Sequence, residues 1–243
     1  MLSPGLVLAI GLAVIHGFAA QLPIFSFIPR FRWTSFAGGV SLSYVFLEIL
    51  PELSHTQKEL QHAEIPLVQY LENHVYILAL LGLVVFYGLD WLALTAKRNR
   101  PVINHRAGSG AAVFWIHISG FALLNFILGY LLQELDAHGL LTCILFFVAV
   151  ALHLFIIDES LREHHTSLYD KQGRWVLVGA IVLGAIAGQT IHLNEAAIAI
   201  VWSFLAGSII LNVLKRELPD EKENCFGSFI GGTALFTALV LLM

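Results

Sequence analysis

The chain has 243 residues, of which 58% are hydrophobic and only 12% are charged, and its mean hydropathy is +0.79. A soluble domain carries about 25% charged residues, so too little polar sequence is present here to cover a soluble protein of this size. The formal net charge is −4, and no basic cluster suggests binding of nucleic acid. We therefore expect contact with a lipid bilayer and no nucleic-acid partner.

The sequence contains eight continuously apolar segments, each of about the 20 residues that a membrane-spanning helix needs. Continuous apolar runs favour helices over the in–out alternation of a membrane β-barrel. No cationic stretch or clear cleavage site marks the first segment as a signal peptide, so we interpret it as a retained helix. The expected fold class is all-α integral membrane, with one transmembrane domain over residues 1–243. The segments comprise residues 4–21, 34–50, 75–96, 111–132, 139–157, 175–191, 196–214 and 226–243.

The Lys and Arg residues fall almost entirely on one side of the expected membrane. If the N-terminus lies outside, the odd-numbered connections hold twelve of the thirteen Lys and Arg residues, and the even-numbered connections hold Lys58 alone. Short loops rich in Lys and Arg stay in the cytoplasm. This asymmetry predicts eight spans with both termini outside, in a multi-pass protein of the cytoplasmic or plasma membrane.

The second and seventh spans carry similar motifs. The motif of the second span runs from Ala37-Gly38-Gly39 to Leu50-Pro51-Glu52, and the motif of the seventh runs from Ala206-Gly207 to Leu218-Pro219-Asp220, just beyond the apolar segment. In the expected topology these spans run in opposite directions, so we interpret spans 1–3 and 6–8 as an inverted repeat around spans 4 and 5. Many secondary transporters have this architecture. The alternative is that Ala-Gly pairs merely pack helices closely, which would also be compatible with a homodimer.

A polar pattern follows the second span. Glu52, His55, Glu59 and His62 lie at positions i, i+3, i+7 and i+10, which places them along one face of a helix. Carboxylates and imidazoles are ligands of zinc and similar ions. We interpret this face as one that captures divalent cations on the outer side, and an ordinary solvated surface is the alternative.

Ionisable residues inside the spans are costly and are functional candidates by default. Imidazole and carboxylate groups suit zinc and related ions, and an aspartate can equally orient a histidine that binds the metal. Hydrogen bonding between helices is the alternative role for each histidine, and pairing with Lys97 or Arg98 is the alternative for the aspartate of the third span. The set comprises His16, Glu48, Asp90, His117, His153 and Asp158.

With these features the chain resembles the Zrt/Irt-like (ZIP) family of divalent-metal transporters. The resemblance rests on the eight spans with both ends outside, on the motif that ends in Leu50-Pro51-Glu52 and on the motif that ends in Leu218-Pro219-Asp220. It implies a ZIP-like fold and transport of a divalent metal, with zinc as the first expectation, toward the cytoplasm. The metal would be the substrate, and no cofactor is expected.

The metal-binding motifs of the family match this chain only in part. The fourth-span motif His-Asn-x-x-acid-Gly corresponds to Leu124–Gly129, where Asn125 and Gly129 match and leucines replace the His and the acid. In the fifth span, His153 matches the histidine and Asp158 falls at or beside a later acid. The resemblance therefore implies an altered core site built from His153, Asp158 and Asn125, to which the residues themselves add His117.

Other functions stay open at this point. A transport-inactive metal-binding or sensing protein on the same fold would lose the same ligands. A transporter of another small solute would use Asn125 and His117 as hydrogen-bonding groups. An intramembrane metal hydrolase would need a dense ligand motif such as HExxH, which the sequence lacks, so no enzymatic activity is expected.

Overall fold

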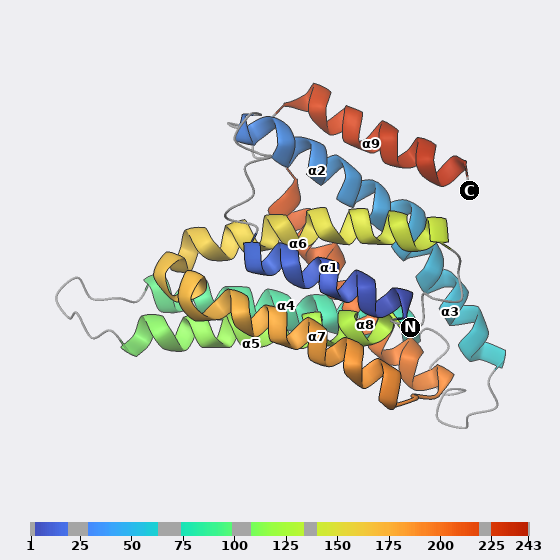
Figure 1. Ribbon diagram of the computed structural model, residues 1–243, viewed down its shortest axis with the longest axis horizontal. Coiled ribbons are helices and arrows are strands. Elements are labelled where there is room, and N and C mark those ends of the chain that lie inside the picture. Colours follow the sequence, from blue (N-terminus) through green and yellow to red (C-terminus); the bar gives the residue numbers. More distant parts are fainter. Residues whose placement is uncertain are drawn as a thin grey trace.

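The computed structural model describes residues 3–18, 29–62, 74–98, 108–133, 140–218 and 225–242. All regular structure in these ranges is helical, as the composition predicts (Figure 1). The elements are α1 (Pro4–Phe18), α2 (Arg30–Tyr44), η3 (Val45–Ile49), α3 (Leu50–His62), α4 (His74–Arg98), α5 (Gly108–Leu131), α6 (Leu140–Leu168), η5 (Tyr169–Gly173), α7 (Arg174–Thr190), α8 (Glu195–Asn212), η6 (Val213–Glu217) and α9 (Phe226–Leu241), of which those labelled η are π-helical.

Each expected span coincides with a helix of the described part. Two apolar helices, Pro4–Phe18 and Phe226–Leu241, are shorter than a full span and match the first and last expected spans. The chain is therefore a multi-pass integral membrane protein built from helices. Six stretches are long and apolar enough to cross a membrane: Phe31–Lys58, Val75–Leu92, Val113–Leu131, Cys143–Arg162, Tyr169–Thr190 and Glu195–Glu217.

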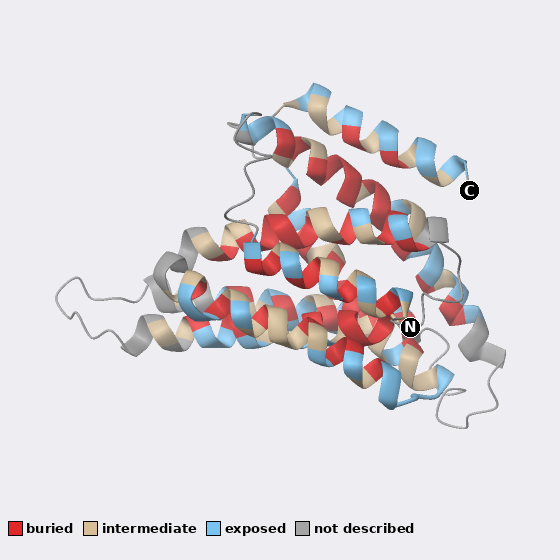
Figure 2. Cartoon of the chain, in the orientation of Figure 1, coloured by how far each residue is buried: buried red, intermediate tan, exposed pale blue. Residues whose placement is uncertain are grey.

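The exterior of the bundle is apolar. Leu80 of α4 is 58% exposed, Trp91 of the same helix 55%, and Leu183 of α7 60%. Figure 2 shows exposed positions along the outward side of α9, whereas buried positions concentrate where helices face one another. A soluble monomer rarely exposes apolar surface on this scale, so the exterior suits contact with lipid.

Both chain ends lie at one end of the bundle in Figure 1, and the turn from α6 into α7 lies at the opposite end. Arg162, Lys171 and Arg174 lie around this turn. We refer to this end as the basic end. An even number of passes accounts for the placement of the two chain ends together.

The second span is longer than its apolar pattern predicts. Its apolar segment ends at Leu50, but the helix continues from Phe31 to Lys58. A proline in a helix collides with the carbonyl of the fourth residue before it, which for Pro51 is Leu47. Leu47 belongs to the π-helical segment η3, which widens the turn at this carbonyl. The helix therefore passes through Pro51 into α3.

The seventh span also continues beyond its expected end. The sequence analysis assigned Lys215 and Arg216 to a connection, but η6 extends α8 as far as Glu217. Leu218 then has an extended backbone, with φ −69° and ψ 125°, because a residue that precedes a proline is disfavoured in the helical region. The added turn brings charged side chains into the bundle.

The helices α2 and α9 touch backbone to backbone. A Cβ atom at Gly39 of α2 would lie 2.2 Å from the Phe229 carbonyl oxygen of α9. Reciprocally, a Cβ atom at Gly232 of α9 would lie 2.1 Å from the Phe36 carbonyl oxygen of α2. Small residues at a crossing allow this approach inside a membrane, and only glycine fits at these two positions.

The helices α4 and α8 repeat the same reciprocal contact. A Cβ atom at Gly82 of α4 would lie 2.1 Å from the Phe204 carbonyl oxygen of α8, and one at Gly207 of α8 would collide with the carbonyl oxygen of Ala79. Moreover, the spacing from Gly207 to η6 is the same as the spacing from Gly39 to η3. The two helix pairs thus share both their crossing and the position of their π-turn.

Packing divides the helices into two groups. The helices α1, α5, α6 and α7 form group A, in which α7 packs extensively on α5 and α1, and α1 also contacts α6. Group B consists of α2, α3, α4, α8 and α9 with η3 and η6, in which α2 packs on α9 and α4 on α8. The two groups meet where α2 faces α6 and where α4 faces α5.

Candidate functional site

A small buried cavity lies where the two groups meet. Its volume is about 30 Å³, which is room for about one or two water molecules. The walls are mostly apolar, and the polar side chains among the lining residues are Ser41, Tyr44, Asn125 and His153. All four are buried. Among the described residues, Ser41 Oγ has no hydrogen-bond partner. Because buried polar groups are normally satisfied, the cavity suits a small polar ligand.

His153 of α6 contacts Glu217 of η6 across the boundary between the groups. The ring Nδ1 and the carboxylate Oε1 are in direct hydrogen-bond contact, and both side chains are buried. A carboxylate that accepts from one ring nitrogen fixes the orientation of the imidazole and leaves the other nitrogen available to a metal. The structure gives Nε2 no partner among the described residues. His153 therefore has the arrangement of an oriented metal ligand beside the cavity.

A second polar network lies within group A and centres on His16 of α1. Its Nδ1 lies 2.8 Å from Asp158 Oδ1 and its Nε2 lies 2.8 Å from Asn125 Oδ1. The Asn125 amide nitrogen donates to the Phe121 carbonyl at 2.9 Å, so the oxygen of this amide faces His16. Tyr169 donates to Asp158 Oδ1 at 2.5 Å. Both nitrogens of His16 thus face acceptors, and Asn125 links this network to the cavity.

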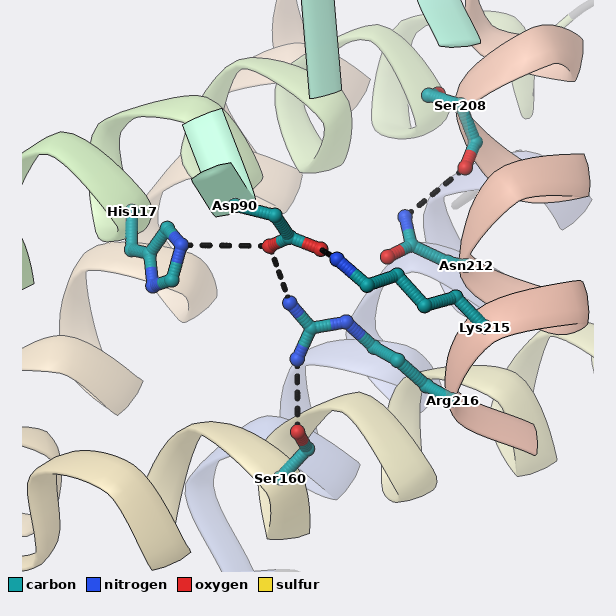
Figure 3. A network of polar contacts seen from close by, with 7 residues as sticks. All are labelled: Asp90, His117, Ser160, Ser208, Asn212, Lys215 and Arg216. Atoms are coloured by element: carbon teal, nitrogen blue, oxygen red, sulfur yellow. Dashed lines mark hydrogen bonds and ion pairs between the residues drawn. The ribbon is translucent and has the colours of Figure 1, made fainter. Parts of the chain in front are cut away.

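A third network joins α4 to η6 near the basic end (Figure 3). The carboxylate of Asp90 contacts Lys215 Nζ and Arg216 Nη2, each at 2.6 Å, and His117 Nε2 at 3.3 Å. Arg216 also donates to Ser160 Oγ at 2.7 Å and lies over the Phe121 ring. Buried charges are costly unless they are paired, and here two cations share one carboxylate.

The structure places the four candidate core residues in different surroundings. His153 and Asn125 line the cavity, whereas Asp158 contacts His16 and Tyr169, and His117 contacts Asp90. In the part of the chain that the structure describes, no three His, Cys, Asp or Glu side chains gather so that they could hold a metal ion. Metal binding at these residues stays a prediction.

The expected outer capture face lies on α3. Glu52 and His55 are exposed there, as a surface that collects ions requires. Glu59 and His62 belong to the same helix, but their side chains lie outside the described residues. The capture role of this face also stays a prediction.

Three charged residues of the site escaped the sequence analysis. Lys215, Arg216 and Glu217 were assigned to the connection after the seventh span, although they follow the apolar run without a break. The proline at position 219 marks the end of the helix more reliably than the loss of hydropathy, because it restricts the residue before it. The alternative role for Asp90 was pairing with Lys97 or Arg98, and the structure pairs it with Lys215 and Arg216 instead.

Comparison of the sequence with models of known protein families and with curated proteins finds no match. The resemblance to the ZIP family rests on short motifs and remains a prediction.

Proposed function

We propose that the chain is a ZIP-like transporter that moves a divalent metal ion, zinc or a related ion, into the cytoplasm through the central cavity. The observation that carries this proposal is the pair formed by His153 and Glu217 beside the cavity. A histidine that is held by a carboxylate and has one free ring nitrogen is the usual arrangement of a metal-binding histidine. Asn125 also lines the cavity, and its side-chain oxygen, which now faces His16, would serve as an oxygen ligand once released.

Asp158 has an indirect role in this proposal. Its carboxylate holds His16, and His16 in turn contacts the side-chain oxygen of Asn125. Loss of the His16 contact would free this oxygen for an ion in the cavity. His117 lies beside Asp90 and would act as a transient ligand when the ion moves from the cavity to the basic end.

Transport would proceed by alternating access of group A against group B. The matched crossings of α2 with α9 and of α4 with α8 support an inverted repeat, and such repeats place the substrate site at their interface. The cavity lies at this interface. The cationic residues at the basic end support a cytoplasmic location of that end and an external location of both termini. Glu52, His55, Glu59 and His62 would collect ions at the outer end.

The size of the cavity favours an ion over an organic solute. A volume of about 30 Å³ accommodates roughly one or two water molecules, whereas sites for organic ligands are about tenfold larger or more. A transport-inactive metal sensor on the same fold is the second candidate, because the cavity can hold an ion without conducting it.

The test is uptake of zinc or cadmium into liposomes that carry the purified protein. We expect uptake by the native chain and its loss in His153→Ala. Glu217→Gln should weaken uptake at low metal concentration by about 10- to 100-fold, the usual effect of removing the partner of a metal-binding histidine.

His192→Ala is the matched control, since His192 is exposed in the connection between α7 and α8 and its loss should leave uptake unchanged. Metal binding without uptake by the folded native chain would favour the sensor. The absence of both binding and uptake across several divalent ions would refute the proposal.

A further inference from the structure

The polar contacts between groups A and B at the basic end share one structural origin. Glu217 contacts His153 of α6, and Arg216 donates to Ser160 of α6 at 2.7 Å. Both Arg216 and Glu217 belong to the π-helical segment η6. A third contact, from Asp90 to His117 of α5 at 3.3 Å, joins the same two groups, and Asp90 itself is held by Arg216.

The cations in these contacts have their acidic partner within group B. Lys215 and Arg216 of η6 both pair with Asp90 of α4, and both of these elements belong to group B. The partners in group A are the hydroxyl of Ser160 and the rings of His117 and His153. Separation of the groups would therefore break hydrogen bonds but would leave the pairs of Asp90 with its two cations intact.

This distribution suits contacts that must open and close. Breaking a buried ion pair leaves an uncompensated charge and is strongly unfavourable, whereas the net contribution of one hydrogen bond to stability is small. Glu217 Oε2 has no partner among the described residues, so opening would let water reach this oxygen. The loss of hydrogen bonds alone and the hydration of Glu217 both keep the free energy of opening low.

We propose that η6 is a latch, in which Arg216 and Glu217 hold Ser160 and His153 and thereby keep the basic end of the central cavity closed. Release of these contacts lets group A move away from group B and opens the cavity toward the basic end. The latch rests on the alternating-access part of the proposed function and not on the identity of the transported ion.

Ile157 provides a reporter for this opening. It lines the cavity, is 2% exposed, and lies between His153 and Ser160 on the same face of α6. In a chain with Cys143→Ser and Cys225→Ser, Ile157→Cys would be the only thiol. Its rate of reaction with a membrane-impermeant maleimide, added from the basic end without metal, measures how often the latch opens.

We expect Ser160→Ala and Glu217→Gln each to raise the labelling rate by about tenfold, because the first removes the acceptor of Arg216 and the second removes the negative charge that strengthens the contact with His153. Lys215→Met is the matched control. Lys215 neighbours Arg216, but its partners among the described residues, Asp90 and the Tyr87 ring, both belong to α4 of group B, so labelling should stay at the rate of the parent chain. Ser160→Ala deletes a single oxygen atom, which keeps the test valid if Glu217→Gln folds poorly.

Unchanged labelling in a well-folded Ser160→Ala variant, or an equal increase in Lys215→Met, would overturn the latch. Since the assay contains no metal, a chain that fails to transport zinc or cadmium can still confirm or refute it.

Discussion

At the scale of single residues, the polar groups of this chain are arranged as contacts between helices. His16, Asn125, Asp158 and Tyr169 come from α1, α5, α6 and η5, and each is buried. In hydrocarbon, an unpaired polar group costs several kcal/mol. The hydrogen bonds of His16 therefore fix how α1 and α5 are rotated against α6.

The carboxylate of Asp158 can be tested by a change that preserves its shape. In Asp158→Asn, an amide group replaces one of the oxygens that face His16 and Tyr169. The free energy of unfolding should fall by about 3 kcal/mol or more, as when a buried pair loses one partner. Unfolding in mixed detergent micelles measures the change.

Asp170→Asn is the control for this prediction. Asp170 pairs with Arg162 at 3.1 Å, but their side chains are 35% and 42% exposed. An exposed pair of this kind contributes about 1 kcal/mol or less. Equal losses in the two variants would contradict the central position that we assign to Asp158.

Sequence reasoning identified several buried ionisable residues of the spans, but it missed Glu217 and did not predict the partners of the others. The cost of a charge in hydrocarbon singled out His16, Asp90 and His153 from the sequence alone. The rotation of each helix decides whether two such residues meet, and a continuously apolar span carries no periodicity from which to predict that rotation. For this reason His117 and His153 were expected in one site, although they contact Asp90 and Glu217 respectively.

At the scale of helices, glycine positions decide which helices lie in contact. Gly232 of α9 faces the Phe36 carbonyl of α2, whereas a Cβ atom at its neighbour Gly231 would have no atom within 4 Å. Gly232→Ala must push the two helices apart and should cost about 1–3 kcal/mol of unfolding free energy. Gly231→Ala should be neutral or stabilising by up to about 1 kcal/mol, since alanine favours a helix.

A glycine at a helix contact and a glycine with open space around it can also be compared in α4, with the same unfolding assay. Gly82 faces the Phe204 carbonyl, and Gly88 has open space around it. Gly82→Ala should destabilise the protein and Gly88→Ala should not. A similar loss of stability in both members of either pair would argue against the observed crossings.

The ends of the helices were harder to predict than their existence. Hydropathy predicts a helix wherever the structure has an apolar one, six of them in the described part long enough to span, because about 20 apolar residues are needed to cross the bilayer. It fails at Pro51, where η3 lets the helix continue, and at Glu217, where charged residues extend the helix. In both places the backbone departs from α-helical geometry, which hydropathy does not register.

At the scale of the whole molecule, the orientation in the membrane can be tested with one native thiol. Cys225 lies at the start of α9 and is partly exposed, whereas Cys143 is buried. The hydrogen bond from the Ser228 hydroxyl, followed by a backbone donor, lowers the pKa of the Cys225 thiol. We expect an impermeant maleimide to label inside-out vesicles, which expose the cytoplasmic face, and to leave right-side-out vesicles unlabelled.

The pH dependence of labelling provides an internal check. Because the thiolate is the reactive form, a lowered pKa means that the rate reaches its plateau at a lower pH than for an ordinary cysteine. Ser228→Ala should move this rise to higher pH. Labelling of right-side-out vesicles would reverse the orientation that the Lys and Arg residues predict.

The internal pairing of charges bears on how the protein responds to voltage. Asp90 and Glu217 balance Lys215 and Arg216 within group B, and His16 and Asp158 form a pair within group A. Displacing one elementary charge across the membrane changes the energy by about 2.3 kcal/mol per 100 mV, but a rigid group whose buried charges sum to zero moves none. These paired residues should therefore contribute no gating current when the empty protein reorients, whereas Glu48 in η3 of group B lies outside these pairs and remains a source of one.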